Sequence, residues 1–276
     1  MSDSIRTTIK MSNDVEIPAL GLGVWQVEDE NELITSCKAA IDAGYWHIDT
    51  ATIYANEDMV GRFVAGNVNR KEIFLTTKLW NSDQDNVEAA FEKSLKDLQT
   101  DYVDQYLIHW PSPKYNNYVE AWKSVVAIYK SGRAKSIGVS NFHKHHIEKI
   151  VDATGFVPHI NQVERHPLYQ QKELEDYCRS LGMIMTAYSP LATGHLPEIA
   201  PKVQPIADKY NKTAAQVILR WHLQTGWVLI PKSVTPSRVA ENANIFDFEL
   251  DGKDMGIIAT IDSNKRFLPD SDNMDF

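Results

Sequence analysis

Cysteine is scarce in this 276-residue sequence, which contains only two such residues. Cys37 and Cys178 each fall in a stretch with helical periodicity, and neither has a second cysteine at metal-ligand spacing. Two isolated cysteines argue against a disulfide scaffold and against a cysteine-based zinc site. They predict reduced thiols and a cytoplasmic protein.

Long apolar runs and an excess of basic charge are also missing. No stretch contains roughly 18 consecutive apolar residues, so no transmembrane helix is expected, and the polar segment 1–10 lacks the apolar core of a signal peptide. Lys and Arg number 28 against 37 Asp and Glu, giving a net charge of -9. This balance argues against a broad surface for nucleic acid or an anionic membrane, but it leaves room for a local basic pocket that binds a phosphate.

What the sequence does contain is a regular alternation of short apolar runs with helical patterns. The runs are rich in β-branched residues, and between them apolar residues recur at spacings of three and four. Strands that alternate with helices predict parallel pairing, because each strand must return across the sheet through a crossover. The eight expected strands are 19–22, 46–48, 73–77, 103–108, 134–139, 159–163, 183–187 and 228–230.

Eight such units predict a (β/α)8 barrel made by a single domain, residues 1–276. The alternative is a doubly wound sheet, whose dinucleotide-binding signature should follow the first strand. There GLGVWQ supplies Gly21 and Gly23 but has Gln26 where the third glycine belongs, and a lone GxG is weak support. Segment 1–17 precedes the first strand, and we expect it to form a hairpin that closes the floor of the barrel.

Polar or amphipathic residues directly follow nearly every apolar run. In a (β/α)8 barrel the carboxyl ends of all strands meet on one face, where the active site lies. A single residue of this kind could serve solubility, whereas a series at nearly every strand indicates a functional face. The residues are Trp25, Asp49, Lys78, His109, Ser140, Asn141, Gln162, Tyr188, Ser189, Lys232 and Ser233.

Three residues of this face and a tyrosine five residues after the first of them form a coherent catalytic set: Asp49, Lys78, His109 and Tyr54. A free phenol has a pKa of about 10, which is high for a proton donor near neutral pH, and a nearby lysine ammonium is expected to lower it. A buried lysine needs a counter-charge, which Asp49 can provide. His109 can donate a hydrogen bond to a substrate oxygen. Taken singly, these residues could be an ion pair, a core histidine and a packed tyrosine; together they predict a site that protonates a carbonyl oxygen.

These residues, in this order, resemble the aldo-keto reductases, which are NAD(P)H-dependent carbonyl reductases built on a (β/α)8 barrel. The likeness runs nearly from end to end. Within the family, the sequence resembles the bacterial branch that includes 2,5-diketo-gluconate reductases and methylglyoxal reductases. The matching motifs are PALGLGVWQ (Pro18–Gln26), HIDTATIYANEDMVG (His47–Gly61), TTKLW (Thr76–Trp80), DYVDQYLIHWP (Asp101–Pro111), IGVSNF (Ile137–Phe142), NQVERHP (Asn161–Pro167), AYSPLATG (Ala187–Gly194) and IPKSVTPSRVAENANIFDFEL (Ile230–Leu250).

The resemblance implies a role for each matching residue. Tyr54 would be the general acid, Lys78 and Asp49 would tune it, and His109 would orient the carbonyl. Tyr188 would stack on the nicotinamide. Hydrogen bonds to its carboxamide would come from Ser140, Asn141 and Gln162. The cofactor contacts would also include Gly23, Val24 and Asp49, with the pyrophosphate held by Ser189, Pro190, Leu191 and Ala192. Ala192 departs from the family, which often carries glycine there, so the path of this loop is open.

The segment after the eighth strand predicts the choice of cofactor. Lys232, Ser233 and Arg238 cluster there in an otherwise acidic chain, and two cations, a hydroxyl and the amides of a helix start suit a phosphate monoester. In the family these positions clasp the adenosine 2′-phosphate, with Val234 beside them and Glu241 and Asn242 near the adenine. We therefore expect NADPH to be preferred over NADH; a solvated helix start with two basic residues is the alternative.

The substrate pocket is less clearly defined. Trp25, Trp80 and Trp110 each lie just past a strand end and, together with Tyr54 and His109, are expected to wall a site for small carbonyl compounds. The tail 264–276 is short and acidic, too small to close a deep pocket, which suggests broad specificity. A monomer is expected.

Two other functions fit parts of the sequence. The run HKHH, residues 143–146, invites a metal-dependent hydrolase, but it opens an expected helix and lacks the matched carboxylates such a site needs, so no metal is expected. A non-catalytic NADPH sensor is the second alternative, because the resembled family includes channel-associated subunits that bind NADPH. No partner-binding extension supports it here.

Overall fold

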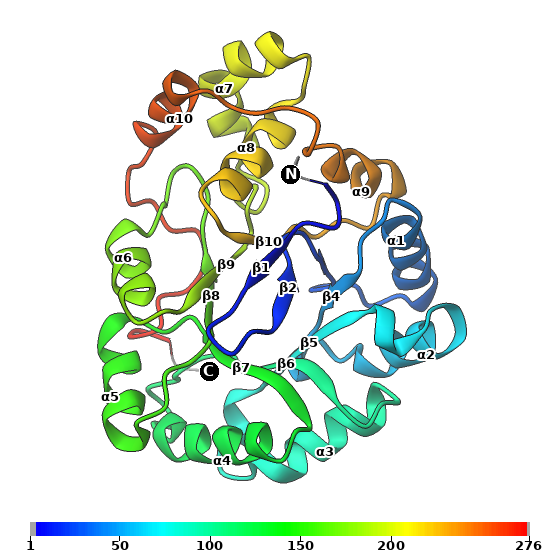
Figure 1. The fold of residues 1–276 in the computed structure, drawn as a ribbon, viewed down its shortest axis with the longest axis vertical. Coiled ribbons are helices and arrows are strands. Elements are labelled where there is room, and N and C mark those ends of the chain that lie inside the picture. Colours follow the sequence, from blue (N-terminus) through cyan, green and yellow to red (C-terminus); the bar gives the residue numbers. More distant parts are fainter. Residues whose placement is uncertain (1–3, 275–276) are drawn as a thin grey trace.

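Eight parallel strands form the centre of the computed structural model, which describes residues 4–274. Neighbouring strands follow chain order, so every strand pairs with the next one along the chain (Figure 1). The strands are β3 (Leu22–Gly23), β4 (His47–Asp49), β5 (Phe74–Leu79), β6 (Val103–Ile108), β7 (Ala134–Ser140), β8 (Ile160–Glu164), β9 (Ile184–Tyr188) and β10 (Val228–Ile230).

The first and last strands of this sheet are joined along a seam, which closes it into a barrel. The Gly21 amide donates to the Leu229 carbonyl over 2.8 Å, and the Leu229 amide donates to the Ala19 carbonyl over 2.9 Å. Parallel bridges also join Gly23 to Lys232 and Leu20 to Leu229. The predicted (β/α)8 barrel is therefore confirmed, and the doubly wound alternative is wrong.

Helices cover the outside of the barrel (Figure 1). Six follow the strands from β3 to β8, each in turn: α1 (Glu30–Asp42), α2 (Glu57–Asn67), α3 (Val87–Asp97), α4 (Tyr118–Lys130), α5 (Lys144–Thr154) and α6 (Lys172–Ser180). Two helices, α7 (Leu196–Tyr210) and α8 (Ala214–Gln224), separate β9 from β10, and α9 (Pro236–Ala243) and α10 (Gly252–Ala259) complete the chain. None of the helices in residues 4–274 is long and apolar enough to cross a membrane.

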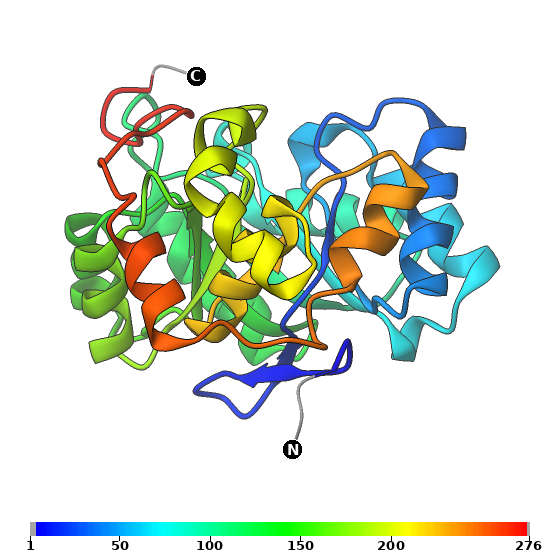
Figure 2. The same cartoon turned by 90° about the horizontal axis from the view of Figure 1, so that it is seen from above.

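The predicted N-terminal hairpin is present. β1 (Thr8–Lys10) and β2 (Glu16–Pro18) pair antiparallel, and Figure 2 shows them below the barrel, at the end opposite the C-terminal tail. Met11 and Ile17 of this hairpin are buried with barrel residues such as Phe74 and Val228 in one apolar cluster. The hairpin thus shields the apolar bottom of the barrel, so the opposite end is the one open to a ligand.

Six of the eight strands end one or two residues beyond the apolar runs, whereas β6 and β10 end with them. Lys78 lies inside β5 rather than after it, Gln162 lies inside β8, and Asp49, Ser140 and Tyr188 are the last residues of their strands. Lys78 pairs with Leu107, and Gln162 pairs with Thr186, so the ladder continues through both. Polar side chains fill the upper barrel, so the apolar pattern of a strand ends before its hydrogen-bonded ladder does. The sequence therefore predicts strands that are too short at this end.

Candidate active site

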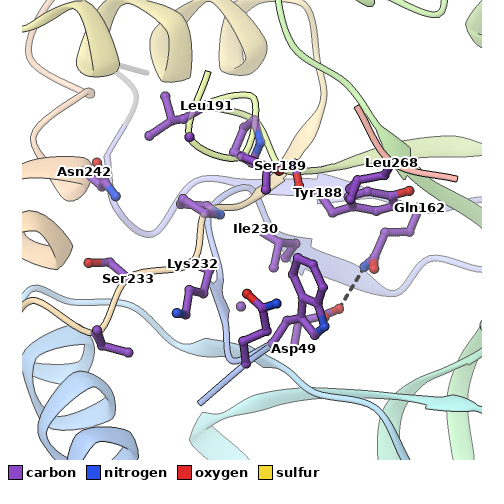
Figure 3. A pocket seen from close by; sticks show the side chains of 18 of the residues that line it. Asp49, Gln162, Tyr188, Ser189, Leu191, Ile230, Lys232, Ser233, Asn242 and Leu268 are labelled. Carbon is purple, nitrogen blue, oxygen red and sulfur yellow. Dashed lines mark hydrogen bonds between the residues drawn. The ribbon is translucent and has the colours of Figure 1, made fainter. Parts of the chain in front are cut away.

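A cavity of about 920 Å³ opens at the carboxyl ends of the barrel strands. Every residue predicted from the sequence to form the site lines this cavity except Val24, Lys78, Ser140 and Ala192. In Figure 3, Asp49 and Gln162 lie at one side of the cavity, while Lys232, Ser233 and Asn242 lie at the other. The expected catalytic and phosphate-binding groups therefore share one continuous space.

Asp49 and Lys78 form a buried ion pair at the base of the cavity. The Lys78 ammonium lies 2.5 Å from Asp49 Oδ1 and 2.8 Å from the Thr50 carbonyl, and its side chain is fully enclosed. Asp49 Oδ2 accepts a 2.8 Å hydrogen bond from the Gln162 amide (Figure 3). Both carboxylate oxygens are therefore occupied, so Asp49 holds Lys78 in one position, as the sequence argument requires.

Tyr54 ends a short 3-10 helix, Thr52–Tyr54, just above this pair. The Thr52 hydroxyl donates to the Lys78 carbonyl over 2.9 Å, which ties this turn to β5. The chain then reverses at Ala55, whose φ of 54° lies in the left-handed region. As a result the Tyr54 hydroxyl lies 3.4 Å from the Lys78 ammonium. The structure thus brings together the expected donor and the expected tuning residue.

The pKa of Tyr54 shifts in the direction opposite to the one expected. Burial raises the pKa of the phenol above its ordinary value of 10.0, and the Lys78 ammonium lowers it by less. The expected net lowering is therefore wrong, because the sequence does not reveal how strongly the barrel mouth desolvates this hydroxyl. Burial lowers the pKa of Lys78, but attraction to Asp49 and Tyr54 outweighs burial and leaves it above its ordinary value of 10.5. At neutral pH the site holds a protonated phenol beside an ammonium.

His109 follows β6 and faces Tyr54 across the cavity. The two rings meet edge to face with their centroids 5.7 Å apart, and the Trp80 ring lies 5.3 Å from the imidazole. Burial, and the charge of Lys78, lower the pKa of His109 well below 6.5, so the ring is neutral at pH 7. Its Nδ1 is buried without a hydrogen-bond partner among residues 4–274, which favours the proton on Nε2. A neutral Nε2–H group can donate to an oxygen in the cavity.

Asn141 lies at the centre of a polar network beside the catalytic set. Its amide nitrogen donates to the His109 carbonyl over 3.0 Å and to the Ser140 hydroxyl over 3.1 Å. Its amide oxygen accepts a 2.5 Å hydrogen bond from the Tyr188 hydroxyl. Ser140 in turn donates to the Gln162 carbonyl and is buried. Ser140 therefore lies behind the cavity wall and orients Asn141 in this structure.

The loop after β9 departs from regular structure at Ser189, Ala192 and Thr193, whose φ angles are 49°, 62° and 43°. Ala192 is fully buried, so of this residue only the backbone could serve a ligand. Thr193 and Gly194 line the cavity and were not predicted, although their place directly after the predicted loop was a usable signal.

Val24, which follows β3, was predicted to contact the cofactor but is buried. Its amide donates to the Asp49 carbonyl over 3.1 Å.

Lys232 and Arg238 line the far side of the cavity, and both are exposed. Neither forms an ion pair with a carboxylate of residues 4–274. Arg238 belongs to the first turns of α9, which begins at Pro236 behind Thr235. Two cations beside a helix start and the Ser233 hydroxyl offer a place for an anion, as the sequence predicts.

The C-terminal tail, residues 264–274, contributes to the cavity, which the sequence argument did not foresee. Leu268 and Pro269 line the wall. Glu164 fixes this segment, because its carboxylate accepts the amides of Phe267 and Leu268 over 2.8 and 3.1 Å. The expectation that the tail is too small to close a deep pocket stays a prediction, but two of its residues do form part of the wall. No periodicity marks such a segment, so only the fold could reveal its contacts.

Known proteins resemble this chain both in amino-acid sequence and in fold. The profile of the aldo/keto reductase family matches residues 19–263. Methylglyoxal reductase DkgA of Escherichia coli K12 is 49% identical over 268 residues, covering 96% of this chain and 97% of that protein. Glyoxal reductase of Bacillus subtilis 168 is 48% identical over the full length of both chains. The crystal structure of a Gox0644 mutant in complex with NADPH superposes with a TM-score of 0.93 at 42% identity, covering 98% of this chain and 99% of that one.

Proposed function

Because the chain belongs to the aldo/keto reductase family, we propose that it reduces small reactive aldehydes of the methylglyoxal and glyoxal type with NADPH. The two reductases named above, each nearly half identical over nearly their whole length, support this substrate class. Keto-sugar acids are further candidate substrates. The observation that carries the proposal is the contact between the Tyr54 hydroxyl and the enclosed Lys78 ammonium, 3.4 Å apart at the base of the cavity.

The proposed role of the protein is to deliver a proton to the substrate oxygen as negative charge develops there. Tyr54 is protonated at neutral pH and acts as the donor, and the adjacent Lys78 ammonium stabilises the phenolate that remains. The neutral His109 donates its Nε2–H to the same oxygen, which orients the carbonyl. Asp49 keeps Lys78 charged and in place without touching the substrate.

NADPH, when bound, supplies the hydride, and the cavity residues fit such a cofactor. Asn141 and Gln162 offer amide groups for the carboxamide, and Tyr188 offers a ring for the nicotinamide face. At the other side, Lys232, Ser233 and Arg238 would hold the 2′-phosphate, with Val234 beside them and Glu241 and Asn242 near the adenine. The absence of carboxylate partners for the two cations within residues 4–274 supports a phosphate ligand there.

The pyrophosphate would lie along the loop after β9, against Ser189, Pro190 and Leu191. Trp25, Trp80 and Trp110 would wall the substrate side of the cavity. Trp25 is more exposed than most large apolar residues of the protein, at 38%, which fits a position at the entrance. We also propose a cytoplasmic monomer; two buried, unpaired cysteines, Cys37 and Cys178, support the reducing compartment.

The proposal is tested by removing the hydroxyl of Tyr54. Tyr54→Phe keeps the ring that packs against His109 but removes the proton donor, so kcat for methylglyoxal should fall by about 10²- to 10⁴-fold. NADPH affinity, followed by quenching of tryptophan fluorescence, should stay within about twofold. A matched control is Tyr115→Phe, an exposed tyrosine outside the cavity lining, which should leave kcat unchanged. Retained turnover in Tyr54→Phe would remove this residue as the acid.

A substrate panel at fixed NADPH then tests the substrate class. Methylglyoxal and glyoxal should give higher kcat/KM than aldoses, keto-sugar acids and aromatic aldehydes. Wild-type protein that binds NADPH but reduces none of them would instead support a cofactor sensor. Light scattering of the purified chain tests the monomer.

A further inference from the structure

Three histidines at the start of α5 meet two aspartates of the C-terminal tail. We call these five residues the His–Asp cluster: His143, His145, His146, Asp270 and Asp272. From the sequence alone no metal is expected at the HKHH run, because no matched carboxylates accompany it. The helix is present as expected, with His143 as the N-cap residue, but the fold brings the missing carboxylates from the far end of the chain.

The donor atoms of the cluster converge. His143 Nε2 lies 3.2 Å from Asp270 Oδ1, and His145 Nε2 lies 3.1 Å from Asp272 Oδ1. The ligand atoms of His143, Asp270 and Asp272 all lie within 4.8 Å of one another, and so do those of the trio His145, His146 and Asp272. Asp272 belongs to both groups, so the two trios meet at this carboxylate.

We propose that the His–Asp cluster binds one divalent transition-metal ion of the zinc type, which fastens the C-terminal tail to α5. Imidazole and carboxylate together form a donor set that zinc accepts, whereas magnesium and calcium prefer oxygen alone. Two donors bound to one tetrahedral ion at about 2.0–2.1 Å are roughly 3.3 Å apart. The His143–Asp270 distance of 3.2 Å is already close to this value, and the donor atoms of His143, Asp270 and Asp272 all lie within 4.8 Å of one another, so side-chain rotation can bring the three onto one ion. Two carboxylates also balance the charge of the ion.

His146 orients a carboxylate and is not itself a ligand. The backbone amide of His143 donates to His146 Nδ1 over 3.2 Å, so that nitrogen carries no proton. The neutral ring therefore has its proton on Nε2, which lies 3.2 Å from Asp272 Oδ1 and donates to it. The metal ligands are then His143, Asp270 and Asp272, whose donor atoms form one group, with water completing the shell. His145 and His146 contact the shared carboxylate of Asp272.

The site is connected to the catalytic cavity through the residue between its two aspartates. Ser271 is buried, and its hydroxyl donates to the backbone carbonyl of Asn141. Asn141 in turn holds the His109 carbonyl through its side chain. Leu268 and Pro269, just before the first aspartate, line the cavity. An ion in the cluster therefore stabilises one wall of the cavity, although its binding does not depend on the proposed reaction.

The test is titration of untagged protein with Zn²⁺, followed by calorimetry. One ion should bind per chain, and Mg²⁺ at the same concentration should not bind. Asp272→Asn should weaken Zn²⁺ binding at least about tenfold, because it removes the carboxylate shared by both groups. Glu148→Gln is the matched control, since it removes a carboxylate from the same helix but outside the cluster, and it should bind as the wild type does.

The effect on the tail is measured by amide hydrogen exchange. Zn²⁺ should slow exchange at residues 267–274 in the wild type and in Glu148→Gln but not in Asp272→Asn. The metal site is overturned if the wild type shows no saturable binding or binds no more tightly than Asp272→Asn. Binding without slower exchange in the tail would overturn its role as a fastener.

Discussion

Replacing Asp49 by asparagine tests whether the ion pair beneath Tyr54 is as buried as the structure indicates. The Lys78 side chain is fully enclosed, and Asp49 is its only carboxylate partner among residues 4–274. Asp49→Asn keeps the shape of the side chain but leaves the ammonium with the Thr50 carbonyl and the Tyr54 hydroxyl. Removing one partner of a buried pair costs about 3–5 kcal/mol, because the remaining charge stays desolvated. We therefore expect the free energy of unfolding to fall by about that amount.

Equilibrium unfolding in urea, followed by the fluorescence of the seven tryptophans, measures this loss. The double variant Asp49→Asn/Lys78→Met should recover most of it, since the uncompensated charge is gone. Asp58→Asn is the matched control: it breaks an exposed pair with Arg62 at 2.8 Å and should cost less than about 1 kcal/mol. The reasoning is refuted if Asp49→Asn costs no more than Asp58→Asn, or if the double variant loses the sum of both single effects.

The remaining predictions concern pH, packing and cofactor choice. Burial lowers the pKa of His47 and His159 to about 4 in the folded protein. Between pH 6.5 and pH 4 the unfolded chain therefore binds protons at these histidines that the folded protein does not. Their contribution to stability is complete above pH 6.5 and should fall by about 1.4 kcal/mol per pH unit and histidine down to pH 4, seen as a lower urea midpoint at pH 5.5 than at pH 7.5. An unchanged midpoint would contradict this. Gly61→Ala should destabilise by about 1–3 kcal/mol, because its Cβ would lie 2.3 Å from the Asp97 carbonyl oxygen, whereas Gly66→Ala on the same helix meets nothing within 4 Å and should stabilise by about 0.5–1 kcal/mol. Equal effects in thermal unfolding would rule out the steric argument. Arg238→Ala should raise the Kd for NADPH by roughly tenfold or more and leave that for NADH nearly unchanged; unchanged NADPH affinity in a cofactor titration would remove the phosphate assignment.

The barrel could be predicted from the sequence because its signal is local and repeated. Each strand and helix carries its own periodicity, and eight repeats of one unit leave few arrangements possible. The placement of Asp49 and His109 at one end follows from this topology alone, since parallel strands all end on the same face. Lys78 lies one residue before the end of β5 rather than after it, because the hydrogen-bonded ladder continues beyond the apolar run.

The rest depends on contacts between distant segments, which leave no periodic trace. Glu164 holds the amides of Phe267 and Leu268, and neither partner signals the other in the sequence. The same holds for Asp272 and the histidines of α5. The pKa of Tyr54 was predicted with the wrong sign because its charged neighbours can be inferred from motifs, whereas its desolvation depends on the whole barrel mouth.

The seam between β3 and β10 has a consequence for how the chain acquires its shape during synthesis. The backbone groups of Gly21 and Leu229 are hydrogen-bonded to each other, yet the ribosome adds Gly21 early and Leu229 late in synthesis of the chain. Until the last strand has left the ribosome, the first barrel strand exposes an open edge with unpaired amides and carbonyls. Such an edge can pair with strands of other nascent chains, so the unfinished barrel is exposed to misassembly throughout this interval.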